Sequence, residues 1–343
     1  MTGSNEEEQQ VVVILGTGGT IAGAAGASAE PGDDVNYTAG QVGVAQLIGA
    51  VPGLRGLPLT CEQIAQVDSK DMDFALWQRL AARCRHWLAR PEVRAIVITH
   101  GTDTLEETAY FLTQVLPAGK AVVLTCAMRP ATAPNADGPR NLLDAVTLAR
   151  DAGAATAGVL MVCAGQVHGA LEVQKVHTQR PDAFSSGEAG PLARIDQNAV
   201  SWERKVPNAL VQRSSEAIEK IVNAVRWPRV EIVLNHVGAG RLLVDSLVAA
   251  GVDGIVAAGT GNGTLRNELE AALEAAQAAG VRVVRATRCV DGAVRPRVGD
   301  PFEPSAGLSA VKARVALLLD LLGGADAGSG TASGRFGQDR SGR

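Results

Sequence analysis

The chain has few aromatic residues and no long apolar run. Phenylalanine, tryptophan and tyrosine make up 3% of its 343 residues, and two of them are tyrosines. No apolar run approaches the roughly 18 residues that a membrane-spanning helix needs, so we expect no membrane partner. The amino terminus, MTGSNEEEQQ, is acidic and polar, whereas a secretory signal carries positive charge followed by an apolar core. We therefore expect a cytoplasmic protein, or a periplasmic one if a signal has been removed.

The cysteine and histidine patterns of a metal site are also missing. Five cysteines are scattered without a C-x-x-C pair, and three lie in or beside apolar runs, which predicts buried, reduced thiols. The five histidines show no metal-ligand spacing and no HExxH motif. With a formal net charge of -4, no basic face for nucleic acid is expected. We expect a small-molecule substrate and no metal, cofactor or nucleic acid.

The glycine-rich turns do not match phosphate-binding motifs. Residues 11–15 predict a strand, and the following GTGGTIAG at 16–23 fails the G-x-G-x-x-G pattern because its sixth position is Ile21. The pair Gly119-Lys120 is followed by Ala121, where a Walker motif has Ser or Thr. A nucleotide-binding interpretation is therefore weak.

Strand and helix patterns alternate along most of the chain, which predicts an α/β fold with a mostly parallel sheet covered by helices. Because 343 residues exceed a typical single core, we expect two domains. The predicted larger domain spans 11–194, an irregular charged linker 195–228, and a smaller flavodoxin-like α/β domain 229–322. The polar ends, 1–10 and 323–343, are expected to be disordered. Predicted helices include 38–48 and 74–88.

The stretch 95–115 places polar residues beside a strand end. Residues 95–98 (AIVI) predict a buried strand, and an apolar stripe from 105 to 115 predicts a helix. Thr104 and Glu107 have the spacing of a capping box, as Asp137 is placed to cap a later helix. Thr102 and Asp103 then lie at the sheet edge where open α/β folds bind ligands. They are candidate site residues, with simple helix capping as the alternative.

Three polar clusters and one lysine suit acyl transfer: 18–20 (GGT), 68–70 (DSK), 101–103 (GTD) and Lys175. A threonine hydroxyl needs an adjacent base, and a lysine can serve if burial lowers its pKa, with an aspartate to orient it. Gly19 beside Thr20 would let a substrate approach backbone N–H groups that stabilise an oxyanion. Tyr37 ends a loop at 24–34 that we interpret as a lid, so it is either a packing aromatic or a phenol over the site.

Two longer segments of the chain are TGGTIAG at 17–23 and HGTDTLEETAYF at 100–111. They are similar to the two signature segments of the bacterial L-asparaginases, and the resemblance covers about residues 11–322. The likeness continues at 36–38, 127–130, 136–142, 254–256, 261–263 and 312–314. The second segment is long and specific, so the chain is identified as a member of this family.

The resemblance implies roles for the matched residues. Thr20 would be the nucleophile, and Tyr37 would close over the substrate and hydrogen-bond the Thr20 hydroxyl. Thr102, Lys175 and Asp103 would form a second triad. The implied reaction is hydrolysis of asparagine to aspartate and ammonia through an acyl-enzyme at Thr20.

Further matched positions concern substrate binding and assembly. Asp103 and Ser69 would hold the α-amino and α-carboxylate groups, and the Ala127 carbonyl would face the side-chain amide. Asn262 matches a residue that the neighbouring subunit contributes, which implies a dimer, usually paired into a tetramer.

The chain departs from the family pattern in three places. Lys70 stands where the family has Gln or Glu, and would repel the substrate ammonium unless it turns away or pairs with a carboxylate. Leu171-Glu172 replaces an Arg-Asp pair before the lysine segment, and the loop 290–301 is short, without a counterpart for an acidic residue from the neighbouring subunit.

A glutaminase-asparaginase of mixed specificity therefore stays open as an alternative function. So does the deamidating subunit of a tRNA-dependent amidotransferase, although a first strand ten residues into the chain argues against that subunit's extra module. A non-catalytic amino-acid-binding protein is a weaker alternative, because the matched catalytic residue types are present.

Overall fold

A computed structural model describes residues 10–25, 37–206 and 213–323 of the chain. It divides into two compact units, Met1–Ala209 and Leu210–Arg343. The tails expected at 1–10 and 323–343 and the lid loop expected at 24–34 fall, apart from their inner ends, outside the described residues. None of the helices in the described ranges has the length and apolarity to cross a lipid bilayer. The five cysteines are free thiols, and three of them are buried as predicted.

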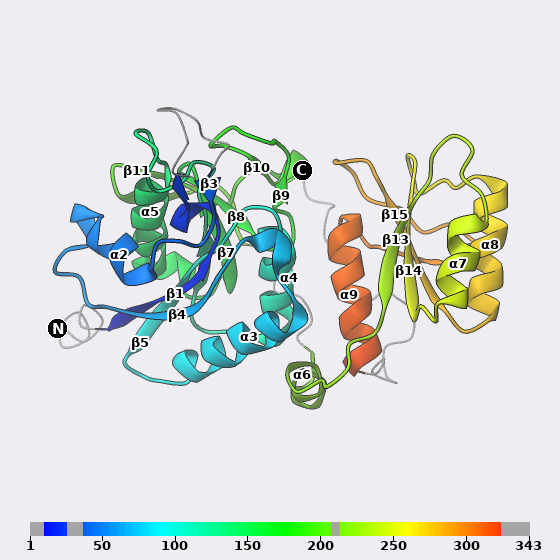
Figure 1. Ribbon diagram of the computed structural model, residues 1–343, viewed down its shortest axis with the longest axis horizontal. Helices are drawn as coiled ribbons and strands as arrows, with labels where there is room; N and C mark the ends of the chain where they lie inside the picture. Colours follow the sequence, from blue (N-terminus) through cyan, green and yellow to red (C-terminus); the bar gives the residue numbers. More distant parts are fainter. Residues whose placement is uncertain (1–9, 26–36, 207–212, 324–343) are drawn as a thin grey trace. The chain divides into compact units, whose positions relative to one another are not determined.

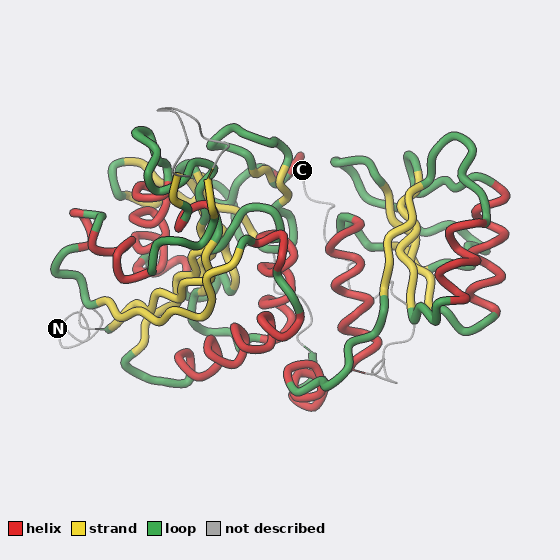
Figure 2. The backbone as a smooth tube through the Cα atoms, viewed as in Figure 1, coloured by secondary structure: helices red, strands yellow, loops and turns green. Residues whose placement is uncertain are grey.

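The first unit is built on an eight-stranded sheet (Figure 2). Five parallel strands lie in the order β4-β1-β5-β6-β7, and β8, β11 and β12 continue it in antiparallel pairing. The bounds are β1 Val11–Gly18, β4 Leu59–Val67, β5 Val93–Thr99, β6 Val122–Thr125, β7 Val159–Cys163, β8 Gln166–Gly169, β11 Ala193–Asp196 and β12 Ala199–Trp202. The predicted mostly parallel sheet is confirmed.

Helices cover both faces of this sheet (Figure 1). α3 (Phe74–Leu88) and α4 (Leu105–Val115) lie on one face, and α2 (Val44–Gly49) and α5 (Gly138–Arg150) lie on the other. The prediction of a helix at 74–88 is confirmed, and Asp73 caps it by accepting a bond from the Leu76 N–H at 2.7 Å. The helix predicted at 38–48 begins only at Val44, because Gly40 has a φ of 69° that a right-handed helix cannot contain.

Short elements connect these layers. β2 (Ala24–Ala25) pairs with β3 (Tyr37–Thr38), and β9 (Gln174–Lys175) pairs with β10 (Phe184–Ser185). Single 3-10 turns occupy Thr20–Ala22, Pro52–Leu54, Ser69–Asp71, Ala152–Ala154 and Gly187–Ala189.

The stretch 195–228, expected to be an irregular linker, contains regular structure. β11 and β12 form a hairpin whose two turn residues, Gln197 and Asn198, both have positive φ, which is the geometry of a tight hairpin turn. The Trp202 indole N–H donates to Asp151 at 2.9 Å and ties the hairpin to the end of α5. α6 (Ser215–Val222) lies further along the same stretch.

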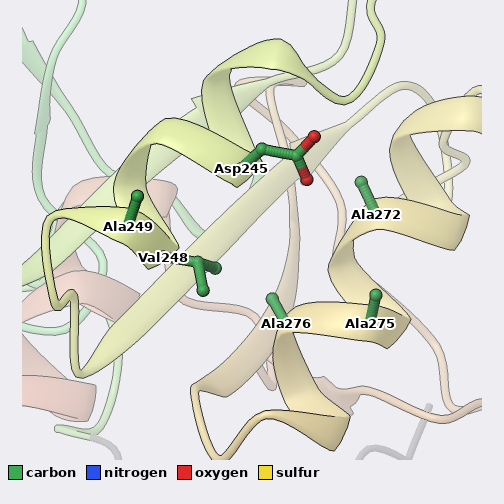
Figure 3. A pocket seen from close by; sticks show the side chains of 6 residues that line it. All are labelled: Asp245, Val248, Ala249, Ala272, Ala275 and Ala276. Atoms are coloured by element: carbon green, nitrogen blue, oxygen red, sulfur yellow. The ribbon is translucent and has the colours of Figure 1, made fainter.

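The second unit is a smaller, parallel α/β domain, as predicted. Its strands follow sequence order, β13 (Val230–Leu234), β14 (Gly254–Gly259), β15 (Arg282–Thr287) and β16 (Glu303–Pro304), rather than the 2-1-3-4-5 order of flavodoxin. α7 (Leu242–Ala249) and α8 (Asn267–Ala278) cover one face, and α9 (Ala310–Gly323) covers the other, with α6 packed against α9 (Figure 1). The groove between α7 and α8 is lined mainly by alanines (Figure 3) and contains none of the predicted site residues.

Candidate active site

The predicted site residues of the first unit follow the carboxyl ends of adjacent strands. β1 pairs with β4 on one side and with β5 on the other, so the turns after these three strands lie next to one another. Thr20 opens the turn after β1, Ser69 opens the turn after β4, and Thr102 follows β5. This is the edge at which open α/β sheets bind ligands.

Two glycines bring these turns into contact. A Cβ atom on Gly19 would lie 2.3 Å from the Gly101 Cα, and one on Gly101 would lie 2.5 Å from the Ser69 Oγ. Only glycine fits at either position, since real Cβ atoms do not approach so closely. The Gly19 N–H donates to the Val67 carbonyl at 2.8 Å, so this group is already used within the fold. Gly19 therefore contributes to the site because the absence of a side chain lets the two turns come into contact.

Thr20 and Tyr37 form the first polar pair. The Thr20 Oγ1 lies 2.6 Å from the Tyr37 hydroxyl, and the threonine is 6% exposed. The tyrosine ring packs against Gly23, where a Cβ would lie 2.8 Å from the ring carbon Cδ2. The phenol that the sequence left between a packing role and a site role thus bonds directly to the candidate nucleophile.

Thr102, Asp103 and Lys175 form a second polar group. The Lys175 Nζ donates to the Thr102 Oγ1 at 2.8 Å and to the Asp103 Oδ1 at 2.7 Å. The Lys175 side chain is 21% exposed and that of Asp103 is 50% exposed. Lys175 lies on β9, and its backbone N–H donates to the Glu106 carboxylate at 3.2 Å, which fixes the strand against the start of α4. The structure therefore brings Lys175 to two adjacent residues that lie more than seventy positions away in the sequence.

Ser69 lies between the two turns. Its Oγ accepts a bond from the Asp103 N–H at 3.1 Å, and its carbonyl accepts one from the Thr104 hydroxyl at 2.7 Å. The predicted Thr104 capping box is therefore wrong: Thr104 occupies the N-cap position but makes no side-chain cap bond. Its hydroxyl donates across to the neighbouring turn instead.

Lys70 turns toward a carboxylate. Its side chain is 60% exposed and pairs with Asp71. The hydrogen bond that Lys70 donates to Asp71 raises the Lys70 pKa above its usual range, so the group stays charged. A lysine is tolerated beside a substrate ammonium when it pairs with a carboxylate, and Lys70 is paired in this way with Asp71. Direct contact between Lys70 and the substrate stays a prediction.

Ala127 lies two residues after the end of β6 and is fully buried. The carboxylate of Asp137 accepts bonds from the N–H groups of Met128 and Arg129, both at 2.9 Å. Asp137 sits at the N-cap of α5 without a side-chain cap bond, so the prediction that it caps this helix is wrong. The Asp137 carboxylate instead bonds to the two backbone N–H groups that follow Ala127.

Asn262 lies in the second unit, in the turn after β14. Its Oδ1 accepts a bond from the Arg295 N–H at 2.7 Å, and its Nδ2 donates to the Arg295 carbonyl at 3.3 Å. The Arg297 guanidinium donates to the Asn262 carbonyl at 2.7 Å. The side-chain amide thus holds the loop after β15, a role that the sequence did not reveal.

The sequence analysis did not name His100 as a candidate site residue, although it begins the HGTD segment. It is fully buried, its Nδ1 lies 2.7 Å from the Gly101 carbonyl, and its Nε2 has no partner among the described residues. Burial lowers its pKa to about 4, so the imidazole is neutral near pH 7. Within the described ranges, no group of three or more His, Cys, Asp or Glu residues could hold a metal ion.

The fold and the site define a class: a two-domain α/β protein with two hydroxyl networks at one sheet edge, chemically suited to acyl transfer. The chain belongs to the asparaginase family, since residues 11–208 match the model described as "Asparaginase, N-terminal" and residues 229–328 match "Glutaminase/Asparaginase C-terminal domain".

Named relatives agree with this membership. The chain is 38% identical over 322 residues to L-asparaginase 2 of Bacillus subtilis (strain 168), covering 93% of this chain and 84% of the relative. It is 37% identical over 277 residues to a glutaminase-asparaginase of Pseudomonas fluorescens biotype A, covering 80% and 75%. A crystal structure of a probable cytoplasmic L-asparaginase from Campylobacter jejuni matches with a TM-score of 0.83 and 35% identity, covering 91% of this chain and 95% of that one.

Proposed function

We propose that this protein is an amidohydrolase that converts L-asparagine and water to L-aspartate and ammonia. The observation that carries the proposal is the pair of hydroxyl networks joined through the contact between Gly19 and Gly101. One network contains a hydroxyl with a phenol at 2.6 Å, and the other a hydroxyl with a lysine at 2.8 Å. The substrate is proposed from the names of the relatives.

In the proposed first step, the Thr20 Oγ attacks the amide carbon. The Tyr37 oxygen at 2.6 Å is the nearest proton acceptor for the threonine hydroxyl. The proton lost by the Thr20 hydroxyl is passed on to the amide nitrogen, which leaves as ammonia and gives an aspartyl ester of Thr20. Because the Gly19 N–H is already bonded, other N–H groups of these turns must stabilise the oxyanion.

In the proposed second step, water hydrolyses the ester. Lys175 and Asp103 hold the Thr102 hydroxyl, and this group accepts a proton from the attacking water and passes one to the departing Thr20 oxygen. The products are aspartate and regenerated Thr20, so atoms and protons balance over the two steps.

The substrate's polar groups have matching partners. The half-exposed carboxylate of Asp103 suits the α-ammonium. The Ser69 hydroxyl accepts from a backbone N–H and can therefore donate its own hydrogen to the α-carboxylate. These contacts are the proposed source of preference for an amino-acid amide over a simple amide.

Glutaminase activity is the second candidate, favoured by the relative from Pseudomonas fluorescens that carries this name. Glutamine is longer by one methylene, a difference that a pocket distinguishes by about 10- to 200-fold. A deamidating subunit that depends on a partner protein would release no ammonia from the free amino acid alone.

The test is ammonia release by the purified protein from L-asparagine, L-glutamine and D-asparagine. Thr20→Ala and Thr102→Ala should each abolish release while circular dichroism stays unchanged. Thr113→Ala is the matched control, because the Thr113 hydroxyl bonds within α4, to the Ala109 carbonyl at 2.9 Å. Full activity in either site variant would refute the assignment of that hydroxyl.

We further propose a homo-oligomer, built as a tetramer from dimers whose sites lie at the dimer interface. Support comes from four exposed apolar side chains at the end of β13 and around the start of α7 (Leu234, Val237, Leu242 and Leu243). They belong to the carboxyl edge of the sheet that also carries Asn262. Light scattering on the wild type and on Val237→Asp tests the assembly, and a wild-type monomer would refute it.

The proposed compartment is the cytoplasm, and fractionation of producing cells tests it.

A further inference from the structure

The backbone around Ala127 is fixed by two side chains of one helix turn. The Asn141 Nδ2 donates to the Cys126 carbonyl at 2.9 Å, on the amino side of Ala127. On its carboxyl side, the Asp137 carboxylate accepts the N–H groups of Met128 and Arg129 at 2.9 Å each. Ala127 is thus held from both sides by α5 and its N-cap residue.

The two side chains also fix each other. Asp137 and Asn141 lie one helical turn apart, and the Asn141 Nδ2 lies 3.2 Å from the Asp137 Oδ2. The Asn141 Oδ1 accepts the Ala164 N–H at 3.0 Å, which ties the pair to the end of β7. Asn141 is 2% exposed, and its amide donors and acceptor are all engaged, so its rotamer is locked.

The bond to Met128 bears directly on the Ala127 carbonyl. The Met128 N–H and the Ala127 C=O belong to one planar, trans peptide group, in which they point in opposite directions. A carboxylate on the N–H therefore sets the direction of the C=O, which points away from Asp137. It also polarises the peptide and strengthens the carbonyl oxygen as an acceptor.

We propose that Asp137 and Asn141 are positioning residues that aim and strengthen the Ala127 carbonyl toward the leaving amide of the substrate. The proposal rests on the proposed function, in which this carbonyl faces the side-chain amide. Such an acceptor helps a leaving group that carries N–H bonds and gives no help to one that lacks them. The pair would therefore favour amide over ester hydrolysis.

The experiment compares L-asparagine with the β-methyl ester of L-aspartate, whose leaving group has no N–H. Asp137→Asn keeps the size of the side chain but replaces one acceptor oxygen by a donor. We expect kcat on asparagine to fall about tenfold and kcat on the ester to fall less than about twofold. Asn141→Asp, which removes the donor to Cys126, should show the same selectivity.

Asp151→Asn is the matched control at the other end of α5. The Asp151 carboxylate also accepts one backbone N–H, from Gly153 at 2.8 Å, and one side-chain N–H, from Trp202 at 2.9 Å. This variant should leave both substrates unaffected. Thermal melting of every variant checks folding, and Asn141→Asp carries the test if Asp137→Asn does not fold.

The outcomes separate the two proposals. Equal loss on amide and ester, or no loss on either, overturns the positioning role. A wild-type protein that releases no ammonia from asparagine overturns the proposed function instead.

Discussion

Replacing Lys175 by methionine and by arginine separates two roles for its amino group. Lysine can act as a base, which requires it to lose a proton, or it can hold Thr102 and Asp103 by its charge alone. Methionine removes both roles. Arginine keeps the charge and the donors but cannot be deprotonated in a protein.

The expected magnitudes follow from the contacts. Lys175 bonds to Thr102 at 2.8 Å and to Asp103 at 2.7 Å, and general acid–base catalysis typically contributes about 10²- to 10⁴-fold in rate. We therefore expect kcat to fall by about 10²-fold or more in Lys175→Met. Because the Asp103 side chain is 50% exposed, water can replace the lost partner, and the free energy of unfolding should fall by less than about 1 kcal/mol.

The assay is steady-state ammonia release on asparagine, paired with thermal melting. Lys220→Met is the matched control, since Lys220 forms an exposed i,i+4 pair with Glu216 on α6. If Lys175 acts as a base, Lys175→Arg should be as inactive as Lys175→Met. Retention of more than about a tenth of the wild-type rate in the arginine variant would refute the base and leave a charge role.

Three further predictions concern Lys70, Asn262 and His100. Lys70→Gln should change KM for asparagine by less than about threefold, because the exposed ammonium already pairs with Asp71; a larger change would indicate contact with substrate. Asn262→Ala should speed hydrogen exchange in the loop at 290–300, which the amide holds through Arg295, and unchanged exchange would refute that role. The His100 imidazole stays neutral in the fold down to about pH 4, whereas an unfolded chain binds its proton below about 6.5. The free energy of unfolding should therefore fall by about 3 kcal/mol between those pH values, and by less in His100→Asn, as denaturant titrations would measure. A slope unchanged from the wild type would refute the assignment to His100.

Local periodicity was sufficient for the central elements of the fold. β5 contains the predicted strand at 95–98, and α3 has the predicted bounds. Both could be predicted because the buried apolar residues form a regular pattern along the element. β4 was missed because it is an edge strand that pairs with β1 alone and keeps polar residues along much of its length. The hairpin of β11 and β12 was missed because the turn signal Gln197-Asn198 is a weak one without glycine.

The candidate site divides in the same way. Thr102 and Asp103 follow a strong strand signal and could be proposed from their position. Lys175 lies 73 residues from Thr102, on a strand of two residues, and no local pattern connects them. The family resemblance supplied that pairing. The amide of Asn262, bonded to a loop 33 residues away, was beyond both kinds of reasoning.

The failed capping predictions have a common cause that is informative about the site. Asp73 caps α3 as the local rule expects, by accepting a bond from the Leu76 N–H. Thr104 and Asp137 occupy N-cap positions too, but their side chains bond to backbone groups of adjacent turns. Each of those turns carries a predicted substrate contact, Ser69 in one and Ala127 in the other. The local capping rule therefore fails at two positions where the side chain holds a turn that carries a predicted substrate contact, which is where functional demands are expected to override local preference. The amide-to-ester comparison on Asp137→Asn tests that relation directly, because loss of a mere cap would destabilise the helix without distinguishing the two substrates.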